Sequence, residues 1–221
     1  MSPFEIVGTV LGIVGVWLMI RQNIWGWPVG LVQVAVYAWI FFEAKLYSDA
    51  ILQAFFFAIQ AYGWAHWIRG ERRGARGEGE VPTAGERLRE PSLPVSRLSG
   101  RAIGGWIAMG AVGTAAWGEL MRRETDAALP HWDAFILVFS LIAQWLQARK
   151  RLECWAGWMI VNVVGIGVYW AKDLRLTSGL YAVFFAMAVA GHVQWRRSMR
   201  EENRAVEPRM DTDEHRLGRL R

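Results

Sequence analysis

The chain has 221 residues, of which 53% are hydrophobic, with 14 Trp and a formal net charge of +5. Its single cysteine, Cys154, excludes an intrachain disulfide and any multi-cysteine metal site. The positive net charge alone would suit a protein that binds nucleic acid. However, the apolar residues gather in long runs, and in a membrane protein the position of Lys and Arg matters more than their sum.

Seven apolar segments follow one another along the chain. They cover residues 4–20, 24–42, 50–68, 102–120, 132–147, 155–171 and 178–195. Each approaches or exceeds the roughly 17 residues that cross a hydrocarbon layer. None has the alternation of a membrane barrel strand. The first has no basic region before it and no cleavage site after it, which favours a helix over a signal peptide. The sequence therefore predicts an all-α integral membrane protein with seven transmembrane helices.

The basic residues lie mostly on one side of these helices. That side holds twenty, namely Arg21, eight arginines within residues 69–101, Arg149, Lys150, Arg151 and eight arginines within residues 196–221. The other side holds five: Lys45, Arg122, Arg123, Lys172 and Arg175. Because cytoplasmic loops are enriched in Lys and Arg, we expect a plasma-membrane protein with its N-terminus outside and its C-terminus in the cytoplasm.

Two segments have a different composition from the helices. Residues 70–100 are rich in Arg, Glu, Gly and Pro, which predicts a flexible cytoplasmic linker without a packed core. The tail from Arg196 has the same character. Aromatic residues are not interleaved with these charges, so we expect no nucleic-acid partner.

The chain carries an internal repeat. Residues 27–67 align without gaps with residues 155–195 at an offset of 128, which pairs Trp27 with Trp155, Leu46 with Leu174, Leu52 with Leu180, Phe56 with Phe184, Phe57 with Phe185, Gly63 with Gly191 and Trp67 with Trp195. The fourth helix restores the orientation of the second triplet, which predicts two parallel three-helix repeats with a solute site between them. The predicted units are a first repeat (1–68), a linker (69–101), a joining helix (102–120), a second repeat (131–195) and a tail (196–221).

Polar side chains inside the predicted helices are candidates for that solute site. Trp155, Trp158 and Asn162 share one helical face, where two indoles and a carboxamide would suit a flat cationic ring. Gln53 and Gln60 form a similar face. Two alternatives stay open: Trp155 in an interfacial aromatic belt, and amides that merely bond between helices, worth about 0.6 kcal/mol each.

Catalytic and metal-binding groups are not apparent within these helices. His66 and His192 have no carboxylate in the middle of a span to pair with, because acids such as Glu119 fall at helix ends, and no serine has a base at helical spacing. We therefore expect no enzyme activity, no metal and no cofactor. Passive transport is favoured, and an intramembrane receptor is the alternative of a different class.

Several motifs in order resemble the PnuC family of nicotinamide riboside transporters. They are Trp27-Pro28-x-Gly30, Tyr47-Ser48-Asp49 with Leu52-Gln53, Tyr62-Gly63-Trp64-x-x-Trp67, Glu153-x-Trp155-x-x-Trp158-x-x-x-Asn162 and Leu176-Thr177-x-x-Leu180-Tyr181. The resemblance implies substrate contacts at Trp155, Trp158, Asn162, Gln53, Gln60, Thr177 and Tyr181.

The same resemblance implies a SWEET-like pair of repeats and a homotrimer. It also implies facilitated uptake of nicotinamide riboside that feeds NAD synthesis, the substrate being trapped by phosphorylation. Two stretches depart from the family pattern, Gly165-Ile166-Gly167 and Ala190-Gly191-His192. These departures leave the substrate open, and thiamine, another flat cation, is the alternative vitamin.

Overall fold

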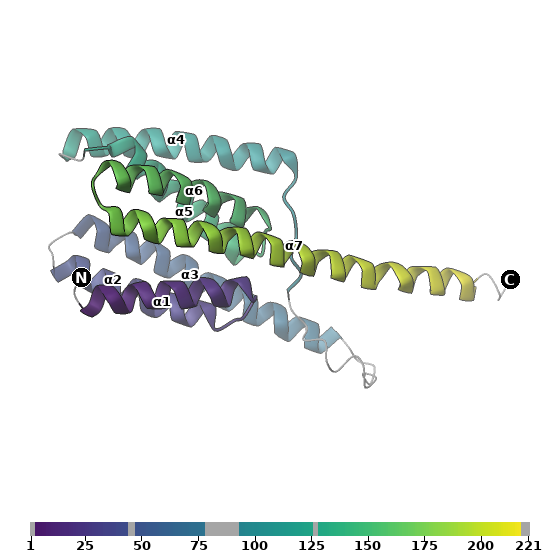
Figure 1. Ribbon diagram of the computed structural model, residues 1–221. Helices are drawn as coiled ribbons and strands as arrows, with labels where there is room; N and C mark the ends of the chain where they lie inside the picture. The colour runs from purple at the N-terminus through teal and green to yellow at the C-terminus, as the bar shows by residue number, and fades with distance from the viewer. Residues whose placement is uncertain (1–2, 44–46, 78–92, 126–127, 218–221) are drawn as a thin grey trace.

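The computed structural model describes residues 3–43, 47–77, 93–125 and 128–217. Within these residues the chain forms seven helices, which confirms the all-α fold. They are α1 (Pro3–Ile20), α2 (Gly26–Glu43), α3 (Tyr47–Gly77), α4 (Gly100–Glu124), α5 (Pro130–Ala148), α6 (Glu153–Ala171) and α7 (Arg175–Leu217). The helices run side by side, with α4 at the edge of the bundle beside α5 (Figure 1).

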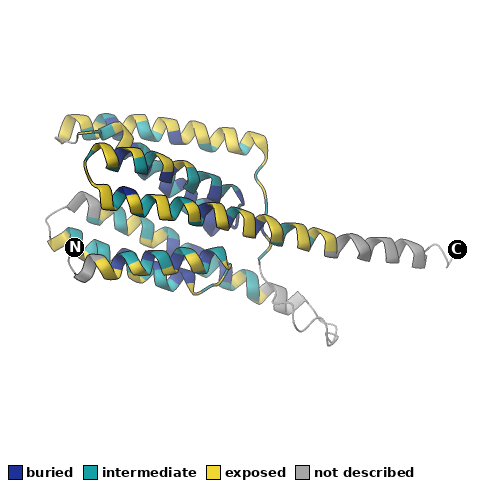
Figure 2. Cartoon of the chain, in the orientation of Figure 1, coloured by how far each residue is buried: buried dark blue, intermediate teal, exposed yellow. Residues whose placement is uncertain are grey.

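The outer surface of the bundle is apolar. Large side chains such as Ile107 and Val112 on α4 are exposed, as contact with lipid allows. Most of α4 is coloured as exposed in Figure 2. By length and composition alone, three helices among the described residues can cross a membrane: α2, α6 and residues Arg175–Arg204 of α7. Helix α1 contributes the shorter apolar run Ile6–Ile20. The other three, α3, α4 and α5, lie in the same bundle.

The α1–α2 and α5–α6 turns have the same backbone structure 128 residues apart. Gln22 and Lys150 both adopt a left-handed conformation, with φ of 55° and 50°. The backbone N–H of Gln22 donates to Met19 O (3.0 Å), as that of Lys150 does to Gln147 O (3.0 Å). Helices α3 and α7, which begin at residues 47 and 175, are separated by the same offset.

Four tryptophans form a layer that joins the two halves of the chain. Trp27 meets Trp67 edge to face with ring centroids 5.4 Å apart, and Trp155 meets Trp195 in the same way at 5.4 Å. Trp67 and Trp195 lie 6.2 Å apart and link the pairs. All four side chains are fully buried. We call this set the tryptophan layer.

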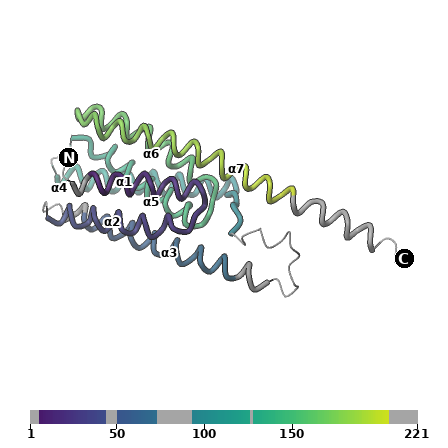
Figure 3. The backbone as a smooth tube through the Cα atoms, turned by 60° about the horizontal axis from the view of Figure 1, so that its bottom comes forward, coloured from purple at the N-terminus to yellow at the C-terminus, as the bar shows by residue number. Residues whose placement is uncertain are grey.

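The linker and tail differ from the prediction. Helix α3 continues to Gly77 and α7 to Leu217, so α7 projects far beyond the bundle (Figure 3). Residues 93–98 pack against the bundle, and Val95 is only 6% exposed. The expectation that residues 70–100 lack a packed core is therefore wrong for this part, while residues 78–92 lie outside the described residues. Local composition missed the packing because the partners of Val95 are distant in sequence.

Candidate functional site

Two buried amides lie at one depth inside the bundle. Gln60 on α3 precedes Trp67 by seven residues, and Asn162 on α6 follows Trp155 by seven. At about 1.5 Å per residue, both lie about 10 Å from the tryptophan layer. Gln60 is 7% exposed and Asn162 is 4% exposed. The two helices thus place carboxamides from both halves of the chain at the same level.

Neither amide is paired within the protein. No hydrogen bond joins the Gln60 or Asn162 side chain to another residue in the described part of the chain. Among the described residues, the fully buried side-chain atoms without a partner are Trp27 Nε1, Thr114 Oγ1, Trp155 Nε1 and His192 Nδ1, so the carboxamide atoms of Gln60 and Asn162 are not sealed in the core. Their carboxamide groups are therefore available to bind a polar solute.

Trp158 lies one helical turn from Asn162 on α6. Its side chain is half-buried, and its indole Nε1–H donates to Gln147 Oε1 on α5 at 2.9 Å. That bond orients the ring. At the offset of 128, Trp158 corresponds to Gly30, over which Gln60 Oε1 lies, while Gln60 itself corresponds to Ala188. In the first half the large side chain of such a pair is Gln60 on α3, and in the second half it is Trp158 on α6. The interior is therefore asymmetric.

Trp155 is enclosed rather than open to a ligand. A Cβ at Gly191 would lie 2.6 Å from its ring, and Trp195 meets it edge to face. The Trp155 indole N–H, like that of Trp27, is buried without a partner. In this conformation Trp155 belongs to the closed tryptophan layer, on the same face of α6 as Trp158 and Asn162.

Gln53 and Tyr181 form a second level further from the tryptophan layer. Each precedes its tryptophan, Trp67 or Trp195, by 14 residues, which is about 21 Å along the helix. Tyr181 packs against Gly165 and lies 5.0 Å from the Tyr169 ring. The unusually small residue at Gly165 thus makes room for the tyrosine ring.

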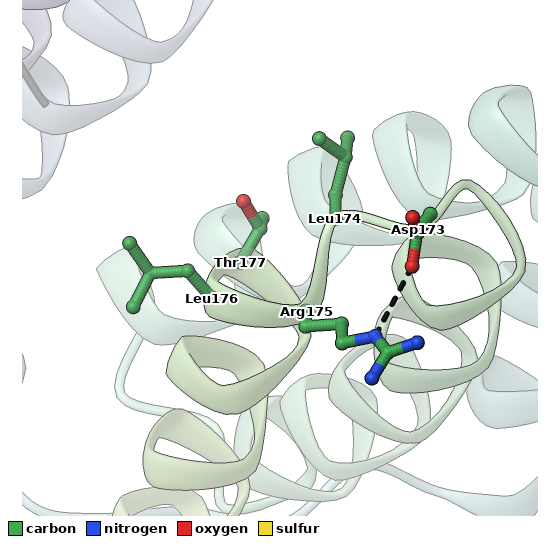
Figure 4. Close-up of a pocket in the computed structure, with 5 residues that line it drawn as sticks. All are labelled: Asp173, Leu174, Arg175, Leu176 and Thr177. Atoms are coloured by element: carbon green, nitrogen blue, oxygen red, sulfur yellow. Dashed lines mark hydrogen bonds and ion pairs between the residues drawn. The ribbon is translucent and has the colours of Figure 1, made fainter.

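Thr177 lies at the far end of α7, beside a surface pocket. The pocket has a volume of about 480 Å³ and is lined by Asp173, Leu174, Arg175, Leu176 and Thr177. The Arg175 Nε–H donates to Asp173 Oδ1 at 3.1 Å on its rim (Figure 4). Thr177 precedes Trp195 by 18 residues, which is about 27 Å along the helix.

The seven residues predicted to contact the substrate therefore follow a path rather than surround one point. They extend from the tryptophan layer at Trp155 to the surface at Thr177, so one vitamin-sized solute cannot touch all of them at once. Gln60, Trp158 and Asn162 form the level at which amides and an aromatic ring occur together. We call these three the central level. The sequence analysis did not identify Gln147, whose only signal was an amide as the last residue of the predicted span 132–147.

No group of three or more metal-binding side chains gathers among the described residues. Carboxylates that pair with cations lie at helix ends, as Asp133 does with Lys172 at 2.7 Å.

A helical bundle with an apolar exterior and unpaired amides inside has the architecture of a multi-pass membrane transporter. The chain matches the family described as Nicotinamide mononucleotide transporter over residues 2–197. It belongs to this family of vitamin-type transporters, and it is therefore a multi-pass plasma-membrane protein rather than an enzyme.

Known proteins of two specificities are similar to this chain. The riboflavin/roseoflavin transporter RibM of Streptomyces davaonensis is 30% identical over 91% of this chain and 88% of its own length. The nicotinamide riboside transporter PnuC of Escherichia coli is 28% identical, with the same coverage. The crystal structure of the vitamin B3 transporter PnuC superposes with a TM-score of 0.68 at 25% identity, covering 90% of this chain and 83% of that one.

Proposed function

We propose that this transporter carries nicotinamide riboside by facilitated diffusion and so feeds NAD synthesis. The observation that carries the proposal is the unpaired state of the buried Gln60 and Asn162 amides in the described part of the chain. The PnuC relatives and the vitamin B3 transporter structure support the choice of substrate.

The chemistry of the central level suits this solute. The nicotinamide ring of the riboside is flat and cationic, and an indole face attracts such a ring. The Trp158 ring, held by Gln147, supplies that face. Carboxamides at Gln60 and Asn162 can both donate to and accept from the substrate amide and the ribose hydroxyls.

A flavin is the second candidate substrate, because RibM is 30% identical to this chain. Thiamine remains the third. Trp158 would stack on any of these rings, so the polar contacts must separate them.

Calorimetric titration of the purified protein with nicotinamide riboside, riboflavin and thiamine tests the substrate. We expect measurable binding of nicotinamide riboside and a loss of about 1–3 kcal/mol for Asn162→Ala. The control is Trp132→Ala, whose side chain is 53% exposed and which should bind like the parent. Preferential binding of riboflavin or thiamine would replace the proposed substrate.

We also propose that transport needs no ion gradient, because the Asp133 carboxylate pairs with Lys172 near the helix ends and is not free in the interior. Uptake into proteoliposomes should then equilibrate with the outside concentration. Accumulation above that concentration, abolished by a protonophore, would contradict this mechanism.

The finer architecture is proposed as well. The matching α1–α2 and α5–α6 turns support two parallel repeats, and the distribution of Lys and Arg supports an outside N-terminus with a cytoplasmic linker and tail. The family resemblance supports a homotrimer. Light scattering of the detergent-solubilised protein measures the number of subunits.

A further inference from the structure

Residues 93–98 form an extended segment that is fastened to the α5–α6 turn, and we call it the latch. Its Ser96 N–H donates to Lys150 O at 3.1 Å, and Ser96 O accepts from the Leu152 N–H at 3.0 Å. The Leu98 N–H donates to Glu153 Oε2 at 3.1 Å. Leu93 packs on Gly70 of α3, so the latch connects α3 with the second half of the chain.

Lys150 lies beneath the latch and is nearly inaccessible to solvent, with an exposed fraction of 2%. Its Nζ donates to Leu93 O at 2.8 Å and to Gln22 Oε1 at 3.2 Å. It also lies 4.4 Å from the Trp67 ring centroid. The sequence analysis counted Lys150 only among the basic residues of the cytoplasmic side, and the structure shows that this residue is buried.

The charge of Lys150 is balanced only weakly. No carboxylate forms an ion pair with it in the described part of the chain, and the acids that act on it, Glu202 and Glu71, do so only through long-range attraction. A buried cation held by neutral oxygens and one aromatic face is costly to keep out of water. The hydrogen bonds of Lys150 therefore hold the latch in place, and they can break because water would solvate the freed ammonium group.

The two halves of the chain are joined at the same end of the bundle. The Trp67 Nε1–H donates to Ala148 O (3.1 Å), and the Trp195 Nε1–H donates to Met19 O (3.0 Å). Gln22, the counterpart of Lys150, donates to Ser198 on α7 at 3.0 Å. The tryptophan layer and the latch thus close the linker end of the bundle, with Lys150 Nζ 4.4 Å from the Trp67 ring centroid between them.

We propose that the latch and Lys150 form a gate at the linker end of the transport path, which opens when Lys150 releases Leu93 and Gln22. The gate is asymmetric, because only the second half carries a lysine at this position. This inference rests on the proposed transport function, but its first test does not require a substrate.

Cys154 serves as an internal reporter of the gate. It is the single cysteine of the chain, is fully buried, and lies in the same core cluster as Val95 of the latch. The experiment measures the rate at which a hydrophilic maleimide modifies Cys154 in the full-length protein in lipid nanodiscs.

Two variants weaken the latch independently. Lys150→Gln removes the ammonium but introduces the residue that the first half already carries in the same left-handed turn. Ser96→Pro removes the N–H that donates to Lys150 O, whereas the matched control Ser96→Ala keeps it. Ser96→Pro loses one hydrogen bond and Lys150→Gln loses the two bonds of the ammonium group, so the rate of modification should rise about tenfold or more in both variants, with Ser96→Ala unchanged. Thermal melting of each variant checks that it is folded.

The second test is the exchange rate of labelled nicotinamide riboside across proteoliposomes, which should change in Lys150→Gln. If Cys154 reacts equally slowly in the folded latch variants, or reacts faster without any change in exchange, the latch is not a gate. If the parent protein exchanges none of the three vitamins while Cys154 still responds, the latch opens as proposed and the proposed function is the part that fails.

Discussion

Gly63 lies directly against the face of the Trp27 ring, where a Cβ would be only 2.5 Å from Cη2. Gly191 has the same relationship to Trp155 at 2.6 Å. The two contacts allow α3 to approach α2 and α7 to approach α6 at the tryptophan layer. They explain why the repeat retains a glycine and a tryptophan at these positions in both halves.

We expect Gly63→Ala and Gly191→Ala each to destabilise the protein by about 1–3 kcal/mol, because the rigid indole cannot move aside in a packed core. Thermal melting followed by tryptophan fluorescence measures the change. The matched control is Gly104→Ala on α4, where a Cβ would have no neighbour within 4 Å. That variant should melt at or above the parent temperature, since alanine favours a helix more than glycine does. Equal melting of all three variants would show that the ring contact is not tight.

The depth of each candidate residue predicts a different functional effect. Gln60→Ala should weaken vitamin binding by about 1–3 kcal/mol, because Gln60 belongs to the central level and would lose its hydrogen bond to the solute. Thr177→Ala should leave the dissociation constant unchanged, because Thr177 lies at the surface pocket. Calorimetry measures both. Weaker binding in Thr177→Ala alone would move the site to the surface end of the path.

The orientation in the membrane can be tested with two positions on α7. Arg175 is the first residue of the helix, and Arg200 follows Met199, which packs on the core at the other end of the bundle; both arginines are exposed. In a Cys154→Ala background, an impermeant maleimide added to intact cells should label Arg175→Cys and spare Arg200→Cys. The exposed ion pair of Arg175 with Asp173 contributes little to stability, so its loss should be tolerated. The reverse labelling pattern would invert the proposed topology.

The buried Lys150 predicts a dependence of stability on pH. Removal of water from its ammonium group lowers the pKa of Lys150 to about 8, against the opposing attraction of Glu202 and Glu71. An unfolded lysine keeps its proton up to about pH 10.4. Between these values the unfolded state binds more protons, so the free energy of unfolding should rise with pH, by up to about 3 kcal/mol from this group.

The measurement is the melting temperature of the parent minus that of Lys150→Gln, taken from pH 7 to pH 10. We expect this difference to increase above pH 8 and to stay flat below it. A difference that falls or does not change over this range would mean that Lys150 is hydrated in solution and the latch is open.

The sequence by itself determined the helices and their order. The span predicted at residues 155–171 is helix α6, Glu153–Ala171, and the span at 132–147 is α5, Pro130–Ala148. This succeeded because crossing a membrane demands a long apolar run, which is a local property of the chain. The offset of 128 could also be read directly, since identical residues such as Gly63 and Gly191 occupy equivalent positions.

Only the tertiary structure decided how polar groups are used. Trp155 and Trp158 share a face of α6, yet one is sealed against Gly191 while the other is held by Gln147. The sequence gives Lys150 only as one of three basic residues in a short loop, but it bonds to Leu93 and Gln22, which are 57 and 128 residues away. The physical reason is that burial and hydrogen bonding depend on partners brought together by helix packing, which local composition and spacing do not contain.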